Sequence, residues 1–416
     1  MGPHLQSLLG IIVLVGIAWA LSEDRRALNW RMVAGTLLLQ AAIALLLLKV
    51  PMARGALFAL NGVVTALTAA TAAGTSFVFG YMGGGPAPFA TANPANLVNL
   101  AFSVLPLLMV IAALAALLWY WRVTPFIVRG LAAILRRTVG LGGAVGFSAA
   151  ATVFLGNVEG PLVIRPYLAR LKRTELFILM TVGLSVIAGT VFVLYATILA
   201  ARLPGALGHL LVASLMSLPA GILMARIMVP GPADTELGSD QESVRYRSTV
   251  DALARGTEDG LNLYLRILAM LLVTTALVAL VNIILAQLPA LHGAPLTLER
   301  MLGWAFAPLT WLLGVPWRQA PVAGELMGIK VILNELLAYL HLAALPAGTL
   351  DARSTRIMVY AMCGFANFAS LGIAIGGLNA LIPERRDEVT KLAPRALVAG
   401  VLASCLTGAM IGLLPL

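Results

Sequence analysis

The sequence predicts an all-α polytopic membrane protein with eight transmembrane helices, two re-entrant hairpins of opposite orientation and an inverted repeat. Three observations predict this class. Hydrophobic residues make up 60% of the 416 residues and charged residues only 11%, which lies well outside the soluble range. Apolar runs long enough to cross a bilayer recur along the chain. Two short segments also place a carboxylate among apolar residues, far from any polar loop.

Eight apolar runs are long enough to cross a hydrocarbon core of about 30 Å. They lie near residues 8–22, 31–49, 95–120, 174–202, 205–228, 260–288, 354–383 and 393–415. The first run has no basic segment before it and no small-residue cleavage site before Ser22. We therefore expect a retained helix rather than a signal peptide.

The basic residues predict the orientation of the spans. The formal charge is +10, but the charge is spread over short loops, so we expect no nucleic-acid partner. The loop residues are Arg25, Arg26, Arg31, Arg122, Arg129, Arg136, Arg137, Arg165, Arg170, Lys172, Arg173, Arg226, Arg385, Arg386, Lys391 and Arg395. By the positive-inside rule these loops are cytoplasmic. An even number of spans then places both termini in the periplasm of a bacterial inner membrane.

Two stretches are apolar and also contain a carboxylate at a break. Residues 143–170 run apolar into Gly156-Asn157-Val158-Glu159-Gly160-Pro161 and return to basic residues of the same side, which predicts a hairpin entering from the cytoplasm. Residues 314–345 contain Asn334-Glu335 and predict a second hairpin entering from outside, with Gly324 and Gly328 flanking a turn. A carboxylate at membrane depth costs about 3 kcal/mol, so these acids indicate function.

Each predicted hairpin is followed by two spans, so the order of elements repeats with opposite membrane orientation. Inverted repeats with interrupted helices are typical of secondary transporters with a site near the bilayer midplane. We expect breaks at Gly183–Thr190 in the fourth span and at Cys363–Gly372 in the seventh. The small-residue stretch 54–80 suits a helix along the membrane surface.

These expectations divide the chain into five regions. They are a scaffold of three transmembrane helices with interfacial helices over residues 1–137, a first repeat with hairpin 1 and spans 4 and 5 over 138–230, a cytoplasmic linker over 231–260, span 6 with an interfacial helix over 261–312, and a second repeat with hairpin 2 and spans 7 and 8 over 313–416.

Several strings resemble those of the concentrative nucleoside transporter family. They are Gly156-Asn157-Val158-Glu159, Leu333-Asn334-Glu335 with Ala338-Tyr339, Cys363-Gly364-Phe365-Ala366-Asn367-Phe368-Ala369-Ser370, Gly328-Ile329-Lys330 and Gly74-Thr75-Ser76-Phe77-Val78-Phe79-Gly80. The likeness covers nearly the whole chain and is more specific in the second half. It implies a homotrimer of nucleoside transporters, each subunit moving its two repeats across the scaffold like an elevator.

The resemblance also implies which residues bind a nucleoside. The first-hairpin tip, where the family has Gly-Gln-Thr-Glu, binds the base; here Asn157 keeps a donor and an acceptor, Val158 has lost the hydroxyl, and Glu159 is retained. Glu335 matches the ribose-binding acid. The other implied substrate positions are Asn334, Phe365, Asn367, Ser370 and Val191.

The residues at the positions of the family's sodium site depart from the family pattern. By spacing, the positions of the family's sodium ligands are Thr152, Leu155, Val186 and Ile187 here. The family uses an Asn and a Ser side chain with backbone carbonyls. Thr in place of Asn and Val in place of Ser remove side-chain oxygens, which a hard cation prefers. We therefore expect proton coupling with Glu159 as the carrier, because burial in an apolar tip favours the neutral carboxyl group. Sodium coupling remains the alternative.

Other interpretations remain open from the sequence. The solute is a nucleoside or, given Val158, a modified nucleoside or nucleoside-like compound. Glu159 or Glu335 could instead cap a half-helix or pair with Lys330, and Lys330 could cap carbonyls of the second hairpin. An integral-membrane enzyme is less favoured, because we find no nucleophile motif or phosphate loop. We expect no cofactor and no metal site; the four histidines lack metal-ligand spacing, and Cys363 and Cys405 read as packed free thiols.

Overall fold

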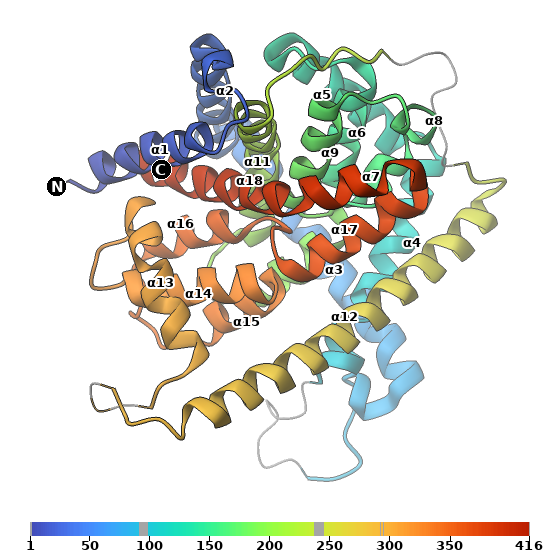
Figure 1. The fold of residues 1–416 in the computed structure, drawn as a ribbon. Coiled ribbons are helices and arrows are strands. Elements are labelled where there is room, and N and C mark those ends of the chain that lie inside the picture. The colour runs from blue at the N-terminus through green and yellow to red at the C-terminus, as the bar shows by residue number, and fades with distance from the viewer. Residues whose placement is uncertain (1, 91–98, 237–244, 292, 294, 416) are drawn as a thin grey trace.

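The computed structural model describes residues 2–90, 99–236, 245–291, 293 and 295–415, and every regular element in them is a helix (Figure 1). The α-helices are α1 (Pro3–Ala20), α2 (Trp30–Lys49), α3 (Pro51–Phe79), α4 (Leu107–Tyr120), α5 (Val123–Val139), α6 (Gly143–Leu155), α7 (Glu159–Leu162), α8 (Arg165–Leu168), α9 (Arg173–Ser185), α10 (Gly189–Leu199), α11 (Ala206–Met228), α12 (Thr249–Leu285), α13 (Leu298–Leu312), α14 (Ala320–Ile332), α15 (Glu335–Ala344), α16 (Ala352–Met362), α17 (Phe368–Leu381) and α18 (Arg386–Leu413). Short turns of other helix types are η1 (Arg25–Ala27), η2 (Gly80–Gly83), η4 (Leu100–Val104) and η5 (Pro383–Arg385).

Among the described residues, eight helices are long and apolar enough to cross a membrane, so the chain is a multi-pass membrane protein. They are Pro3–Ala20, Trp30–Lys49, Gly62–Gly83, Leu100–Tyr120, Arg173–Leu199, Ala206–Met228, Thr249–Leu285 and Pro383–Leu413. Seven of the eight coincide with predicted spans. The exception, Gly62–Gly83, lies where the sequence predicted a surface helix, and it meets the same criteria of length and hydropathy.

The remaining predicted span, residues 354–383, is divided between α16 and α17. Its break at Cys363–Asn367 has a counterpart at Val186–Ala188, between α9 and α10. The two breaks touch: the Phe365 amide donates to the Val186 carbonyl at 3.2 Å. Gly364 is needed here, because a Cβ at this position would lie 2.6 Å from the Ser185 carbonyl oxygen. Both predicted interruptions are therefore present, and they cross each other in the core.

The order of helices repeats along the chain. The first half runs α4, α5, the hairpin α6 to α8, the broken helix α9/α10 and the long helix α11. The second half runs α12, α13, the hairpin α14/α15, the broken helix α16/α17 and the long helix α18. In Figure 1 the α18 helix crosses in front of α11, and both adjoin the broken helices. Equivalent elements of the two halves thus meet at the centre of the molecule.

The turn of the second hairpin differs from its predicted position. Gly324 and Gly328 do not flank a turn but lie inside α14, which continues to Ile332. Their role is close packing on α13: a Cβ at Gly324 would lie 2.4 Å from the Gly303 carbonyl oxygen, and one at Gly328 would lie 2.4 Å from Leu302 Cβ. The glycines therefore allow helix contact, and the chain reverses at Leu333.

The predicted linker over residues 231–260 is wrong in its second half. The α12 helix begins at Thr249 and continues without a break for 37 residues to Leu285. The Ser248 side chain caps it by accepting a hydrogen bond from the Asp251 amide at 3.1 Å. Residues 237–244 of the linker lie outside the described residues. The polar composition misled the prediction, because one side of this segment packs on another helix.

That packing is between α12 and α4 and depends on two glycines. A Cβ at Gly256 would lie 2.7 Å from Ala116 Cβ, and a Cβ at Gly260 would lie 2.6 Å from Met109 Cα. Real Cβ atoms do not approach so closely, so the two helix backbones are in direct contact. Small residues at membrane helix interfaces allow such approach.

We expect Gly256→Val to destabilise the protein in detergent by about 1–3 kcal/mol, the usual cost of overpacking. The β-branched side chain must push α4 away from α12. Thermal unfolding of the purified protein measures the effect. Gly35→Val in α2 is the matched control, because a Cβ there meets nothing within 4 Å. Equal unfolding midpoints for the two variants would contradict the proposed α4–α12 contact.

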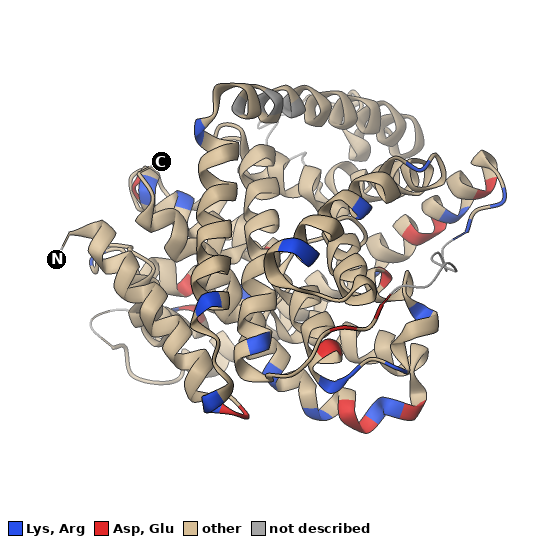
Figure 2. Ribbon diagram, turned by 90° about the horizontal axis from the view of Figure 1, so that it is seen from above, with Lys and Arg blue, Asp and Glu red and all other residues tan. Residues whose placement is uncertain are grey.

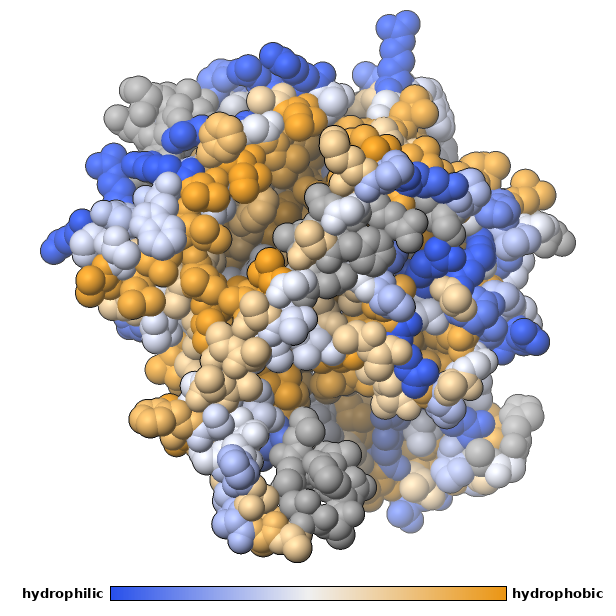
Figure 3. Space-filling view, turned by 180° about the vertical axis from the view of Figure 1, so that it is seen from behind, coloured by the Kyte–Doolittle hydropathy of each residue, from blue (hydrophilic) through white to orange (hydrophobic). Residues whose placement is uncertain are grey.

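Charge and hydropathy are distributed over the surface as in a bilayer protein. Figure 2 shows lysine, arginine, aspartate and glutamate mainly near helix ends and in connecting loops. Figure 3 shows broad hydrophobic areas with hydrophilic residues gathered toward the edges. Along α12 many large apolar side chains are exposed, including Leu272 at 69% and Ile283 at 63%. Such a surface needs lipid or another subunit to cover it.

Glu23 ties the loop between α1 and α2 to both halves of the chain. Its carboxylate accepts a hydrogen bond from Arg173 in α9 at 2.8 Å and one from Arg395 in α18 at 2.7 Å. The hydrogen bond from Arg173, with the charges of both arginines, holds the pKa of Glu23 below its usual value. All three residues lie on the side where the basic loops predict the cytoplasm.

Candidate functional site

Glu335 is the centre of the site and lies at the turn of the second hairpin. It is the first residue of α15, directly after the chain reverses at Leu333-Asn334. Asn334 caps this helix by accepting a hydrogen bond from the Leu337 amide at 2.9 Å. The helix N-terminus offers a favourable potential to the carboxylate. The predicted substrate residue Asn334 is therefore placed as a cap that orients Glu335.

Two side chains from other elements hold the Glu335 carboxylate. The Tyr195 hydroxyl of α10 donates to Oε1 at 2.7 Å, and Asn367 Nδ2 donates to Oε2 at 2.8 Å. Glu335 is only 5% exposed, Tyr195 2% and Asn367 0%. Hydrogen bonds to a charged group are stronger than neutral ones, about 1.5–3 kcal/mol each. The carboxylate is thus fixed at the junction of the second hairpin and both broken helices.

Asn367 joins the broken helix to this carboxylate. Its Oδ1 accepts a hydrogen bond from the Ser370 amide at 2.7 Å and so caps α17, while its Nδ2 faces Glu335. One side chain therefore begins a helix and binds the acid. Asn367 thus joins two neighbouring helices, as one interpretation of the sequence held, and its partner in α15 is the acid of the second hairpin.

The tip of the first hairpin is shaped by glycines. Gly156 has φ +111°, a conformation that disfavours side chains, and ends α6. A Cβ at Gly160 would lie 2.1 Å from Thr152 Oγ1, so only glycine lets the returning arm approach α6. The Ser148 hydroxyl donates to the Gly160 carbonyl at 2.7 Å and joins the two arms.

The tip residues reach toward α17 and the break in α9. Asn157 Nδ2 lies 3.5 Å from the Ser370 carbonyl oxygen, a long hydrogen bond, and its Cβ lies 3.2 Å from the Cβ position of Gly183. Val158 packs on α17, where a Cβ at Gly377 would lie 2.9 Å from its Cγ1. Asn157, Ser370, Asn367 and Glu335 thus form a continuous series of contacts from one hairpin to the other.

Glu159 is placed differently from Glu335. It is the first residue of the short helix α7, and its side chain is exposed rather than buried. Its carboxylate folds back over the tip, with Oε2 3.0 Å from the Cβ position of Gly156. The two acids therefore differ in their surroundings: Glu335 is buried and accepts hydrogen bonds from two side chains, whereas the Glu159 side chain is exposed at the hairpin tip, where the sequence predicted burial.

The remaining predicted substrate residues border the same junction. Val191 is buried at 3% exposure in the first turn of α10, four residues before Tyr195 and on the same helix face. Phe365 lies in the break before α17 and is partly exposed. Sequence reasoning missed Tyr195, although its spacing of four from Val191 was a usable signal.

The positions that match the family sodium ligands offer one side-chain oxygen, the Thr152 hydroxyl, and otherwise only backbone carbonyls. The Thr152 hydroxyl donates to the Ser148 carbonyl at 2.8 Å, and the Val186 carbonyl accepts the Phe365 amide at 3.2 Å. The Ile187 carbonyl accepts the Ser214 hydroxyl at 3.4 Å. The side chains of Leu155, Val186 and Ile187 provide no oxygen.

Lys330 lies in α14, the first arm of the second hairpin, and its side chain is fully buried. Its Nζ donates to the Ser404 hydroxyl of α18 at 3.3 Å, so it joins the hairpin to α18 and is not placed as a carbonyl cap. Cys363 and Cys405 are buried free thiols. Among the described residues no group of histidine, cysteine and acidic side chains is arranged to hold a metal ion.

Two repeated units, each with a hairpin and a broken helix that meet around a fixed carboxylate, define a secondary transporter of the inverted-repeat class. Comparison with known proteins agrees. The chain matches the family models described as Na+ dependent nucleoside transporter N-terminus over residues 9–82, nucleoside recognition over 101–202 and Na+ dependent nucleoside transporter C-terminus over 209–412.

Individual relatives match over almost the whole chain. The nucleoside permease NupC of Helicobacter pylori is 34% identical, with 98% of this chain and 97% of that protein covered. CNTnw in an inward-facing substrate-bound state superposes with a TM-score of 0.89 at 36% identity, covering 98% of this chain and 97% of that one. An outward-facing variant of CNTnw gives 0.90 at 35% identity, covering 99% and 97%. The chain belongs to the concentrative nucleoside transporter family.

Proposed function

We propose that this protein is a secondary active transporter that imports nucleosides across the bacterial inner membrane by cation symport. The observation that carries this proposal is the Glu335 carboxylate, held by Tyr195 and Asn367 where both broken helices meet the second hairpin. A carboxylate can accept about four hydrogen bonds. Two are used by the protein, which leaves acceptor capacity for the two hydroxyls of a ribose.

The first hairpin is suited to contact the base. The Asn157 amide offers a donor and an acceptor, and its contact with the Ser370 carbonyl is long at 3.5 Å, so a base edge can replace it at little cost. Val158 adds an apolar surface and no hydrogen bond. Base recognition in this chain therefore rests on Asn157, Glu159 and the packing of Phe365 and Val191.

The proton is the proposed coupling ion. The matched family models carry the description Na+ dependent, but here Thr152 has the only side-chain oxygen among the four corresponding positions. A sodium ion needs several oxygen ligands at once. Glu159, exposed beside the hairpin tip, is placed to exchange a proton with water and to lie next to a bound base.

The division of the chain into a scaffold and a transport region is consistent with an elevator movement. In this proposal the hairpins, broken helices and the long helices α11 and α18 move together as the transport region. The direct contact of α4 with α12 fits a separate scaffold, and the exposed apolar side chains of α12 fit the homotrimer interface. Both termini then face the periplasm.

Coupling is tested in proteoliposomes with an imposed pH gradient. We expect labelled uridine to accumulate when the lumen is alkaline relative to the outside, equally in sodium and in choline medium. A protonophore should abolish accumulation. Sodium-dependent uptake that ignores the pH gradient would refute proton coupling and would leave nucleoside transport itself in place.

The solute is tested by competition in the same vesicles. We expect unlabelled nucleosides to inhibit uridine uptake, and free bases or free ribose to inhibit far less, because each engages only one of the two hairpins. Chromatography should recover the label chemically unchanged, which separates a transporter from an enzyme. Strong inhibition by free bases alone would contradict the ribose role of Glu335.

A further inference from the structure

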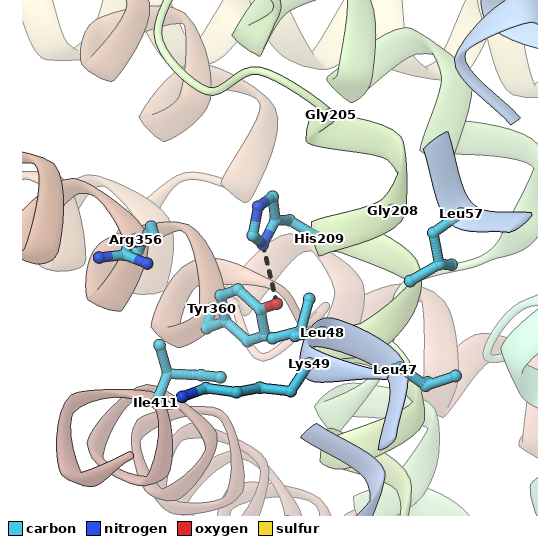
Figure 4. A pocket seen from close by; sticks show the side chains of 10 residues that line it. All are labelled: Leu47, Leu48, Lys49, Leu57, Gly205, Gly208, His209, Arg356, Tyr360 and Ile411. Atoms are coloured by element: carbon cyan, nitrogen blue, oxygen red, sulfur yellow. Dashed lines mark hydrogen bonds between the residues drawn. The ribbon is translucent and has the colours of Figure 1, made fainter. Parts of the chain in front are cut away.

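A cavity that shares no lining residue with the Glu335 site lies near the ends of α2 and α18 and the beginnings of α11 and α16. Its volume is about 300 Å³. The lining residues are Leu47, Leu48, Lys49, Leu57, Gly205, Gly208, His209, Arg356, Tyr360 and Ile411 (Figure 4). They come from the first region of the chain and from both repeats.

The charged side chains that line this cavity have one sign. Lys49, Arg356 and His209 supply basic side chains, and no aspartate or glutamate is among the lining residues. A concave site lined by one charge sign, with low-dielectric walls, concentrates ions of the opposite charge. The chemistry of the lining therefore selects an anion.

Lys49 is the group best placed to bind it. It is the last residue of α2, and in Figure 4 its side chain extends across the cavity toward Ile411 of α18. Within the described part of the chain its ammonium group has no hydrogen bond or ion pair. Other basic side chains on this side form hydrogen bonds with backbone carbonyl groups: Arg202 donates to the Ala343 carbonyl, and Arg353 donates to the Gly412 carbonyl. Among the described residues, Lys49 forms no such bond.

The other walls of the cavity are ordered and close-packed. The Tyr360 hydroxyl and His209 Nδ1 lie 3.0 Å apart in a hydrogen bond, and Tyr360 is fully buried. Gly208 allows α11 to approach α3, since a Cβ there would lie 3.2 Å from Leu57 Cβ. Figure 4 shows the imidazole above the phenol ring, with Lys49 passing below.

The position of the cavity along the helices and its apolar lining residues indicate which kind of anion it binds. The end of α2 and the beginning of α11 lie on the side that the basic loops predict to be outside. Leu47, Leu48, Leu57 and Ile411 place hydrocarbon directly beside the basic groups. A phosphodiester joined through glycerol to acyl chains likewise places an anion next to hydrocarbon.

We propose that this cavity binds a phosphate anion, and that its source is the headgroup of an anionic phospholipid in the outer leaflet of the inner membrane. Lys49 and Arg356 contact the phosphate, and the leucines and Ile411 cover the glycerol and the first acyl carbons. The bound lipid joins α2 to α11, α16 and α18, so it connects the first region of the chain to both repeats.

Lipid titration of the purified full-length protein tests this proposal without any transport assay. Short-chain phosphatidylglycerol should raise the thermal unfolding midpoint and appear as a bound adduct by native mass spectrometry, whereas phosphatidylcholine should do neither. Lys49→Gln and Arg356→Gln should each weaken phosphatidylglycerol binding about fivefold, and the double variant about 25-fold, as expected for one basic contact each near a membrane surface.

Two controls and one further ligand complete the test. Arg318→Gln removes an exposed basic residue from the same predicted side and Lys391→Gln one from the opposite side; both should bind the lipid like the parent protein. Lys49 is exposed, so its replacement leaves the core intact. Equal binding of both lipids, or unchanged binding by the double variant, would overturn the proposal. Stabilisation by inorganic phosphate, lost in the double variant and without lipid preference, would overturn the lipid source and assign the site to the free anion.

Discussion

Glu335→Gln should reduce nucleoside uptake at least about 100-fold and weaken nucleoside binding by a similar factor. The carboxylate accepts hydrogen bonds from Tyr195 and Asn367 inside the protein. The amide of glutamine has one oxygen and one donor NH₂, so one of the two partners must face a donor. Losing one of these hydrogen bonds and making the other a bond to a neutral group amounts to about 3 kcal/mol, which corresponds to about a 100-fold change. Uridine uptake and calorimetric binding measure the effect.

The control for this variant is Glu384→Gln, which changes an exposed carboxylate near η5 and should leave uptake unchanged. Tyr195→Phe removes one of the two donors and should give an intermediate loss of about tenfold, within the usual range for a charged hydrogen bond. Size-exclusion chromatography checks that each variant is folded. Normal binding by folded Glu335→Gln would remove the basis for the ribose site.

Glu159→Gln should abolish accumulation driven by a pH gradient while nucleoside exchange continues. Glutamine keeps the size and the hydrogen bonding of the neutral acid but cannot carry a proton. With one proton per nucleoside, each unit of pH gradient supports about tenfold accumulation, since one pH unit corresponds to about 1.4 kcal/mol. The accumulation ratio of the variant should therefore fall to about one, whereas exchange of internal for external uridine needs no net proton movement.

The matched control is Glu258→Gln, an exposed acid on α12, which should accumulate uridine like the parent protein. The comparison of accumulation with exchange separates loss of coupling from loss of binding. If Glu159→Gln still accumulates uridine in a pH gradient, the proton is carried elsewhere. Loss of exchange together with accumulation would show that nucleoside binding itself needs the ionisable acid, and it would leave the proton-carrier role of Glu159 without support.

Much of the architecture follows from local features of the sequence. The length of the apolar runs predicted seven of the spans, and the glycine-rich strings predicted the break between α9 and α10 and the break between α16 and α17.

The glycines of the second hairpin were harder to interpret. Gly324 and Gly328 read as turn residues, but they lie in α14 and allow close contact with α13. A glycine that bends a chain and one that allows helix contact look alike in sequence, because the partner helix is not visible.

The same limitation affected the site. The polar stretch before Gly260 read as a loop, although it continues α12 against α4. Tyr195 lies 140 residues from Glu335 in the chain, so no local sequence pattern could predict the hydrogen bond between the Tyr195 hydroxyl and the Glu335 carboxylate. Asn334 was predicted as a substrate contact, and the structure adds that its side chain caps α15.

The chain's hydropathy was enough by itself to establish a multi-pass helical protein, and the placement of its acids was enough to single out two candidate carboxylates. Their different environments came only from tertiary structure. Glu335 is fixed because residues from α10 and α17 converge on it, whereas Glu159 stays exposed because the first hairpin's tip directs it away from such partners. Hydrophobic length is a property of a segment, but the surroundings of a charge depend on which distant segments pack beside it.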